Sequence, residues 1–328
     1  MSHFFSLDEA FRGMLAKLLT EGERVRSRNG ETLELTAQSI TIERPLDRFL
    51  RTPGRNNNPF AAIAETMWIV AGRNDLGYLA PYLPRAPKYS DDGGGTWRAG
   101  YGPRLRDWQG IDQVAQVYSL LSASIDSRRA VISLFDPAID NVESNDIPCN
   151  NWLHFLSREG RLDLHVVARS TDIWFGFSGI NVFEWSVLLE MMARWLHLDV
   201  GQLTFFTSSL HLYAEEHENR ARIINGDDAL ITAPTTHPRL GYDTDWGNAA
   251  TAHQQWMQLE CQLRDGASLG DLEIPFEDPM LVGFIRAIDV FWAYRHGQSA
   301  STIDAGLDAL GENDLADAAR AYFKWKRV

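Results

Sequence analysis

The sequence predicts an α+β fold made of one domain, and three observations support this prediction. Stretches with the apolar spacing of helices are interspersed with stretches rich in β-branched residues. No internal repeat, linker or break in composition divides the 328 residues. This length is large for one domain, but an α+β domain with insertions reaches it.

Local patterns predict the elements in order. Ser6 followed by Glu9 is a capping box, which predicts a helix beginning near residue 7. Apolar spacing predicts further helices over residues 60–72, 111–125 and 184–197 and along the chain after Thr251. Strands are predicted over residues 31–43, 130–135, 152–157, 161–168 and 203–213. Polar or glycine-rich composition predicts loops over 51–59 and 84–104, and the second is a candidate active-site loop.

Composition excludes several classes of function. The net charge of −13 argues against binding of polymeric nucleic acid, although a few clustered arginines still suffice for one small anion. The sequence shows no targeting peptide and no apolar run of membrane-spanning length, so a cytoplasmic protein without membrane contact is expected. The His and Cys residues have no ligand spacing, so no metal is expected.

Cys149 is the candidate nucleophile. A lone Cys is more often a small buried hydrophobe, but Cys149 stands among polar and turn-forming residues and so is predicted to be accessible. Arg169, at the end of a predicted strand, would favour the thiolate, which is the reactive form. The second cysteine, Cys261, lies in a helical pattern and is interpreted as structural.

The order of several short motifs resembles the thymidylate synthase superfamily over roughly residues 5 to 220, whereas residues 225–328 match poorly. Each motif is weak alone, but their order around a cysteine is specific. The motifs are Asp126-Ser-Arg-Arg129, Pro148-Cys149, Arg169-Ser-Thr-Asp172, Gly176 to Asn181 and His211-Leu-Tyr213, with Glu65, Trp68 and Tyr101-Gly102 also at the family's places. The resemblance implies a thymidylate synthase-like fold, in which a large mixed sheet lies at a two-fold dimer interface with helices packed on the other face.

The resemblance also implies a reaction. Cys149 would add to C6 of a pyrimidine nucleoside monophosphate, and C5 would then take a carbon from 5,10-methylenetetrahydrofolate, the co-substrate. Arg169 and Ser170 would bind the 5′-phosphate, and Arg169 would lower the pKa of the thiol. Glu65 would organise water for proton transfer, with a pKa raised by burial; a Glu on the wet face of its helix is the alternative.

The remaining roles follow from the same resemblance. Tyr101 and Asn150 would be catalytic residues together with Cys149 and Glu65, and Asn181 would recognise N3 and the C4 substituent of the base. Further substrate contacts would come from Arg128 and Arg129 of the other subunit, from Arg28 (or Arg26, one register away), and from His211 and Tyr213 at the sugar 3′-hydroxyl. Asp172 and Trp68 would contact the folate. Taken alone, Arg128-Arg129 is a solvated pair, and the His211-Tyr213 pattern fits core residues equally well.

Departures from the family pattern indicate the product. A thymidylate synthase usually has His where Asn150 stands, Gln where Ala168 stands and tryptophans where residues 87–90 stand, and residues 176–181 carry one extra residue. A less covered site favours water addition, so a hydroxymethylase is expected, with a thymidylate synthase and an inactive nucleotide-binding protein as alternatives. Asn181 favours uracil, whereas Asn150 and the reshaped loop favour cytosine; cytosine, as dCMP or as the CMP used in nucleoside-antibiotic pathways, is narrowly preferred.

Overall fold

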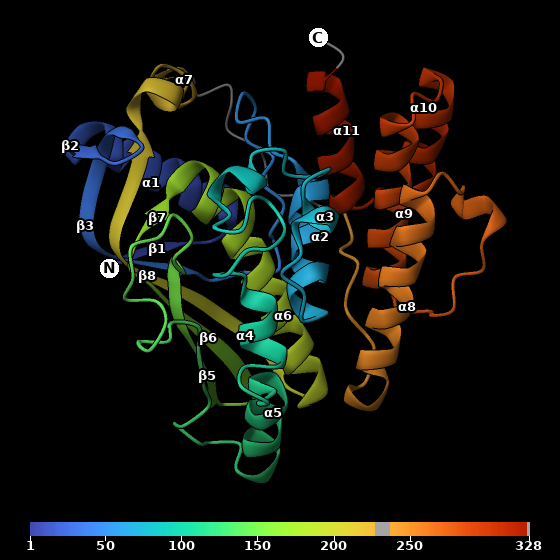
Figure 1. Ribbon diagram of the computed structural model, residues 1–328, viewed down its shortest axis with the longest axis horizontal. Helices are drawn as coiled ribbons and strands as arrows, with labels where there is room; N and C mark the ends of the chain where they lie inside the picture. The colour runs from blue at the N-terminus through green and yellow to red at the C-terminus, as the bar shows by residue number, and fades with distance from the viewer. Residues whose placement is uncertain (227–236, 327–328) are drawn as a thin grey trace.

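A mixed sheet forms one side of the molecule in the computed structural model, which describes residues 1–226 and 237–326 (Figure 1). Its strands are β1 (Ser2–Phe4), β2 (Glu23–Ser27), β3 (Gly30–Ile42), β4 (Val131–Ser133), β5 (Asn150–Arg158), β6 (Arg161–Ala168), β7 (Thr171–Asp172) and β8 (Asp199–Tyr213). The main path runs β1-β3-β8-β6-β5-β4, with β2 paired to β3 and β7 paired to β8. The β1–β3, β6–β8 and β7–β8 pairs are parallel and the others antiparallel.

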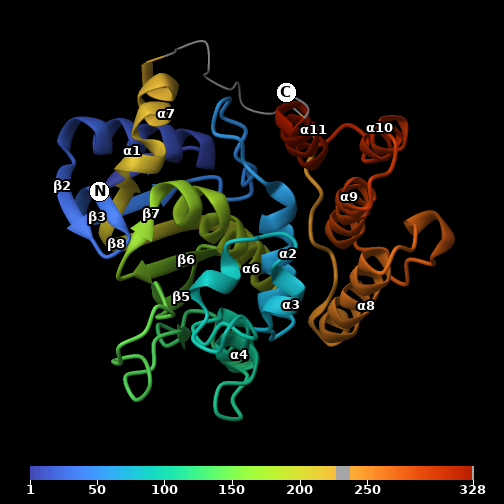
Figure 2. The same cartoon turned by 45° about the horizontal axis from the view of Figure 1, so that its top comes forward.

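Helices cover one face of this sheet. They are α1 (Leu7–Glu21), α2 (Pro59–Val70), α3 (Leu76–Leu79), α4 (Tyr101–Arg106), α5 (Gln113–Ala123), α6 (Val182–Trp195) and α7 (Ala214–Gly226). Helix α6 packs on β6 and β8, α1 packs on β3, and α2 lies behind α6 (Figure 2). The predicted capping box begins α1: the Ser6 side chain accepts from Glu9 N at 3.4 Å, and Glu9 Oε2 accepts from Phe5 N at 2.9 Å.

The chain after residue 244 adds a further layer of helices beyond α2. These helices are α8 (Trp246–Arg264), α9 (Pro279–Arg295), α10 (Ala300–Ala309) and α11 (Asp314–Lys326). The Phe60 ring on α2 contacts the rings of Phe291, Tyr322 and Phe323 with centroid separations of 5.2 to 5.5 Å. Every residue of α2 is therefore buried, because α6 covers one side and these helices cover the other.

The other face of the sheet is less covered by the described residues. Along β5 and β6, fully buried side chains alternate with half-buried ones. The half-buried side chains include Trp152, His154 and His165. Their rings form a row that continues to Phe206 on β8. The predicted mixed sheet with helices on one face is thus confirmed. The two-fold interface on the other face stays a prediction.

Candidate active site

Cys149 lies directly before β5, at the point where β5 and β6 meet. Arg169 N donates to Cys149 O at 2.9 Å, which ties the end of β6 to the residue before β5. The Arg169 guanidinium then donates to Pro148 O and Ile147 O, both at 2.9 Å, and its Nη2 lies 3.7 Å from Cys149 Sγ. Cys149 is exposed, so an accessible thiol and a guanidinium share one edge of the sheet. Cys261 is exposed as well, and it lies on α8, in keeping with its helical pattern.

The pKa of the Cys149 thiol is set by two opposing effects. Desolvation by the walls around the sulfur raises the pKa above its ordinary value, and the Arg169 charge lowers it. The carboxylates of Asp146 and Asp172 add to the increase. Arg169 acts in the expected direction, but the net shift is upward, so the resting thiol holds its proton more firmly than free cysteine does.

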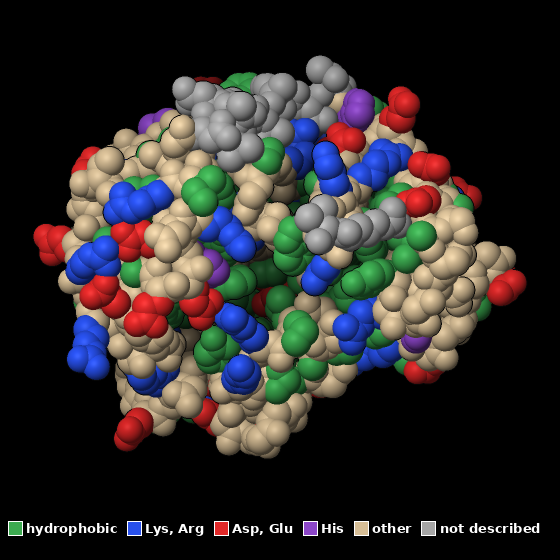
Figure 3. All heavy atoms as spheres, turned by 90° about the horizontal axis from the view of Figure 1, so that it is seen from above, with side chains coloured by type: hydrophobic (Ala, Val, Ile, Leu, Met, Phe, Trp, Pro, Cys, Tyr) green, Lys and Arg blue, Asp and Glu red, His purple; other side chains and the backbone are tan. Residues whose placement is uncertain are grey.

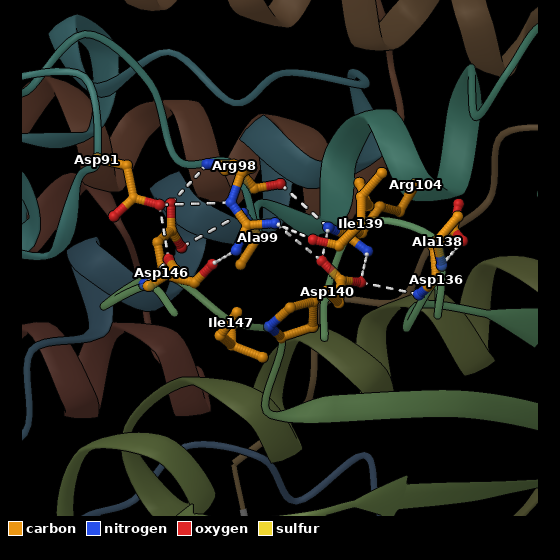
Figure 4. Close-up of polar contacts among 12 residues, drawn as sticks. Asp91, Arg98, Ala99, Arg104, Asp136, Ala138, Ile139, Asp140, Asp146 and Ile147 are labelled. Atoms are coloured by element: carbon orange, nitrogen blue, oxygen red, sulfur yellow. Dashed lines mark hydrogen bonds and ion pairs between the residues drawn. The ribbon is translucent and has the colours of Figure 1, made fainter. Parts of the chain in front are cut away.

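A clamp of two arginines and two aspartates holds the loop that precedes Cys149; Arg98 is half-buried, and Arg104, Asp140 and Asp146 are buried (Figure 4). Asp146 accepts from Arg98 N at 2.6 Å and Ala99 N at 3.3 Å, and its own carbonyl accepts from Arg98 Nη2 at 2.6 Å. Arg104 donates to both oxygens of Asp140 at 2.6 and 2.8 Å, and Arg98 reaches the same carboxylate at 3.1 Å. Asp146 is three residues from Cys149, so the clamp fixes the approach to the thiol.

Tyr101 and Asn150 form a hydrogen-bonded pair on the inner side of Cys149. The Tyr101 hydroxyl accepts from Asn150 N at 3.1 Å and from Asn150 Nδ2 at 2.7 Å. Burial raises the pKa of Tyr101, and the negative charges of Cys149 and Glu184 raise it further. The Asn150 side chain therefore faces Tyr101, and its Oδ1 is buried without a partner among the described residues.

Glu65 lies in the buried helix α2, whose start is fixed by the Asn58 cap on Ala61 N and by Pro59 in the first turn. Only 7% of Glu65 is exposed. Burial raises the pKa of its carboxyl to about 8. This matches the value expected of a group that exchanges protons near neutral pH, although its role stays a prediction.

A π-helix, Ile173–Asn181, carries the extra residue seen in the sequence and ends at Asn181. The Asp172 carboxylate caps it by accepting from Trp174 N and Phe175 N, both at 3.0 Å. At its other end, Asn181 Nδ2 donates to Glu184 Oε1 at 2.8 Å. Glu184 is not among the site residues that the sequence predicts, although an acidic residue inside an apolar run is the same signal that indicates Glu65.

His211 and Tyr213 lie on β8 beside β7, where Asp172 is the register partner of His211. Burial lowers the pKa of His211 and raises that of Tyr213, so both are neutral near pH 7. The two rings are in edge contact at 5.3 Å. Arg28 is brought to the same region, because its Nη1 donates to Ser144 O at 3.1 Å. Their substrate contacts stay predictions.

Arg128 and Arg129 are not brought near Cys149 of their own chain. Both are exposed, and the neighbouring Ala130 O accepts from Phe155 N, six residues along β5 from Cys149. At about 3.3 Å per residue, that separation is about 20 Å. If these arginines bind the phosphate, they do so in another subunit's site. Ser170, half-buried, directly follows Arg169.

Trp68 is placed in the core. It is 1% exposed, its Nε1 donates to Asp75 O at 3.0 Å, and its ring is in edge contact with Trp97 at 6.0 Å. This packing does not support a direct folate contact. Trp97, which no sequence motif indicated, lies in the loop before Tyr101 and donates its Nε1 to Ala86 O at 3.0 Å.

The face of the molecule seen from above is hollowed, and Lys and Arg side chains gather around the hollow despite the net negative charge (Figure 3). Within residues 1–226 and 237–326, no group of three or more His, Cys, Asp or Glu side chains is arranged to hold a metal ion. Across that same part of the chain, every helix is too short or too polar to span a bilayer.

Comparison with known proteins supports the resemblance stated above. A deoxyuridylate hydroxymethyltransferase of Pseudomonas phage M6 is 34% identical over 331 residues, covering 98% of this chain and 92% of the phage protein. A deoxyuridylate hydroxymethyltransferase of Bacillus phage SP01 is 36% identical over 221 residues, and the match spans 57% of that protein's length.

The fold is also found in a solved structure. A crystal structure of thymidylate synthase from phage T4 matches 65% of this chain and 79% of its own, with a TM-score of 0.54 and 22% identity. The family model described as thymidylate synthase matches residues 9–244. With most of its length inside this match, the chain belongs to the thymidylate synthase family.

Proposed function

We propose that this chain hydroxymethylates C5 of a pyrimidine nucleoside 5′-monophosphate, with 5,10-methylenetetrahydrofolate as carbon donor. The observation that carries the proposal is the accessible Cys149 thiol with the Arg169 guanidinium at 3.7 Å, in a chain that also holds the buried carboxyl of Glu65. A nucleophile, an anion-binding group and a proton-exchanging acid are the groups that this chemistry requires.

The reaction proceeds in four steps. Cys149 Sγ loses its proton and adds to C6 of the base, which makes C5 nucleophilic. C5 attacks the methylene carbon of the donor, and loss of the C5 proton with release of tetrahydrofolate gives an exocyclic methylene. Water adds to this methylene, and Sγ then leaves C6 as the double bond returns. The base gains one CH₂O in total, and no oxidation or reduction occurs.

Residues of the candidate site bind the phosphate, relay protons and support the nucleophile during these steps. Arg169 and Ser170 bind the 5′-phosphate, with Arg28 from the β2–β3 hairpin above the loop that leads to Cys149. Glu65 relays protons to the base through water, which its raised pKa permits. Tyr101 keeps Asn150 in place beside the thiol.

Uracil is the base we favour, with deoxyribose as the sugar. The phage relatives are named deoxyuridylate hydroxymethyltransferases, and Asn181 stands where deoxycytidylate hydroxymethylases, by the resemblance, often carry Asp. The narrow sequence preference for cytosine rested partly on Asn150, but its side chain is held by Tyr101, so its identity says less about the base than expected. Cytosine remains the second candidate because the π-helix reshapes the base-recognition loop.

Product analysis tests this function. The protein is incubated with 5,10-methylenetetrahydrofolate and each of dUMP, dCMP, UMP and CMP, and the nucleotides are analysed by mass spectrometry. A gain of CH₂O with formation of tetrahydrofolate is expected, most rapidly with dUMP. A gain of CH₂ with formation of dihydrofolate identifies a thymidylate synthase instead, and no product with any nucleotide overturns the proposal.

A further inference from the structure

Three polar side chains on β3 and β8 form a chain of contacts that ends at a residue predicted to bind the sugar. Glu34 on β3 is the register partner of His211 on β8, and Ser209 lies two residues before His211, so the three side chains share one face of the sheet. Ser209 Oγ donates to Glu34 Oε1 and lies 3.5 Å from His211 Nδ1. All three residues are half-buried.

The chemistry of these groups fixes the direction of each hydrogen bond. A carboxylate has acceptor atoms only, so the Ser209 hydroxyl is the donor in its contact with Glu34. A serine hydroxyl has one proton, and its oxygen can then only accept from the ring of His211. A lone pair on Nδ1 would face the lone pairs of Ser209 Oγ and be repelled, whereas a proton on Nδ1 makes the 3.5 Å contact a long hydrogen bond.

The other ring nitrogen of His211, Nε2, is then left with a lone pair. Burial lowers the pKa of His211, so the ring is neutral near pH 7 and carries a single proton. Among the described residues, the contact with Ser209 is the one hydrogen bond that the ring nitrogens make. The nearby Asp172 carboxylate uses its two oxygens to accept from Trp174 N and Phe175 N. Nε2 is therefore available as an acceptor for a ligand.

We propose that Glu34 is a positioning residue: through Ser209 it holds His211 as the Nδ1–H tautomer, which leaves Nε2 to accept a hydrogen bond from the sugar 3′-hydroxyl. The inference deepens the proposed function and rests on its nucleotide substrate. A site built in this way requires a 3′ group that donates. A 3′-fluorine is close to a hydroxyl in size but has no proton, so it would leave Nε2 without a partner and bind about fivefold to tenfold more weakly.

Nitrogen-15 NMR of protein labelled at its histidine rings measures the tautomer directly, because a protonated ring nitrogen and one with a lone pair have well-separated chemical shifts. Signals missing from His211→Gln identify this ring. The wild type is expected to carry the proton on Nδ1. Glu34→Ala releases the Ser209 proton to the ring and is expected to shift the population toward Nε2–H, while the exposed His197 stays unchanged. A wild-type proton on Nε2, which would show that Asp172 controls the ring, overturns the inference, as does an unchanged tautomer in Glu34→Ala.

Calorimetry with dUMP and its 3′-fluoro analogue tests the consequence for binding. The wild type and Ser209→Thr, which keeps a hydroxyl, are expected to bind dUMP about fivefold to tenfold more tightly than the analogue. In Ser209→Ala this ratio is expected to fall toward one, and an equal ratio in all three proteins contradicts the inference. Protein with the Nδ1–H tautomer that forms no product from any nucleotide contradicts the proposed function alone, whereas product formation by protein with the proton on Nε2 contradicts this inference alone.

Discussion

The Cys149 sulfur is held between a guanidinium that favours its charge and walls that oppose it. Nη2 of Arg169 at 3.7 Å lowers the pKa of the thiol, but desolvation raises it by more. Arg169 also donates to Ile147 O and Pro148 O, so the same side chain supports the loop and faces the thiol. A phosphate that binds Arg169 therefore changes the electrostatic environment of the nucleophile directly.

Replacement of the nucleophile is the first prediction. Cys149→Ser is expected to lower kcat by a factor on the order of 10³ or more, because a hydroxyl is far less acidic and less nucleophilic than a thiol. Nucleotide binding, measured by calorimetry, is expected to persist. The exposed Cys261 on α8 supplies the control: Cys261→Ser keeps full activity. Substantial turnover by Cys149→Ser contradicts the covalent mechanism.

The buried acid on α2 predicts how stability depends on pH. Burial raises the pKa of Glu65 from 4.5 to about 8, so between these values the folded chain holds a proton that the unfolded chain has released. Stability contributed at this site therefore falls as pH rises through that window. Glu65→Gln removes the penalty, so its Tm is expected to exceed that of the wild type by a margin that grows from about pH 5 to about pH 8.

Thermal unfolding at several pH values, with activity assayed in parallel, measures this effect. Under the proposed mechanism, Glu65→Gln is expected to lose activity while it gains stability, because the substitution removes the group proposed to exchange protons. The exposed Glu273 provides the control, and Glu273→Gln is expected to follow the wild-type curve. A Tm difference between Glu65→Gln and wild type that stays constant from about pH 5 to about pH 8 would mean that Glu65 is ionised in the folded protein throughout this range.

At the residue scale, sequence predicts a short distance between two side chains most directly where both belong to motifs. The position of Arg169 at the end of a predicted strand places it beside Cys149, and the structure brings the guanidinium to 3.7 Å from the sulfur. Glu184 is not predicted as a site residue, because the apolar pattern places it at the start of a helix. That helix, α6, begins two residues earlier, at Val182. Trp68 was assigned to a cofactor although its buried position depends on Trp97 and Asp75, which no local pattern links to it.

At the scale of elements, the arginine–aspartate clamp orders the long connection between β4 and β5. The side chains of Arg104 and Asp140 are 1% and 0% exposed, so each neutralises the other away from water. Removing one charge leaves the other buried without its partner, and this costs more than the pair contributes when intact.

Asp140→Ala is accordingly predicted to destabilise the protein by about 3 to 5 kcal/mol. Asp308, in an exposed ion pair with Arg320 on the C-terminal helices, is the matched comparison: Asp308→Ala is expected to cost less than about 1 kcal/mol. Urea titrations of both variants give the two free energies of unfolding. Equal losses would show that burial does not determine the strength of the clamp.

Most elements could be predicted from periodicity, and the exceptions have physical reasons. Strands β3, β5, β6 and β8 alternate or are rich in β-branched residues, and the capping box at Ser6 marks α1 within one residue. Strand β2, Glu23–Ser27, is exposed throughout and so lacks an apolar face to reveal it. The π-helix has a wider turn than the α-helical template, so only the extra residue in residues 176–181 indicated an altered loop.

For the molecule as a whole, α2 is shared by the sheet layers and the C-terminal helices. Its Phe60 meets Tyr322 and Phe323 of α11 while its other side packs against α6. The prediction of a single domain over residues 1–328 depends on this shared helix. Phe323→Ala is expected to cost about 3 to 5 kcal/mol by opening a cavity there.

Urea unfolding followed by far-UV dichroism and by tryptophan fluorescence tests both points. One coincident transition is expected for wild type, and Phe323→Ala is expected to move both signals together. Two separate transitions, with only one moved by the substitution, would show that the C-terminal helices form an independent unit.

Subunit mixing tests the predicted two-fold dimer. Arg128 and Arg129 lie about 20 Å along the sheet from their own Cys149, so a complete site needs both chains if these arginines bind phosphate. Cys149→Ser and the double variant Arg128→Ala/Arg129→Ala are each expected to be inactive. After unfolding and refolding together, they are expected to recover about one quarter of wild-type activity, because half the dimers are mixed and each has one complete site. No recovery contradicts shared sites.

The raised pKa of Cys149 has a consequence for survival in an oxidising cell. Peroxide attacks thiolates far faster than thiols, so a sulfur that keeps its proton at rest is shielded from conversion to sulfenic and sulfinic acids. An exposed cysteine beside an arginine would ordinarily be a target for such damage. Here desolvation, which raises the pKa of the thiol, opposes that damage by lowering the fraction of thiolate.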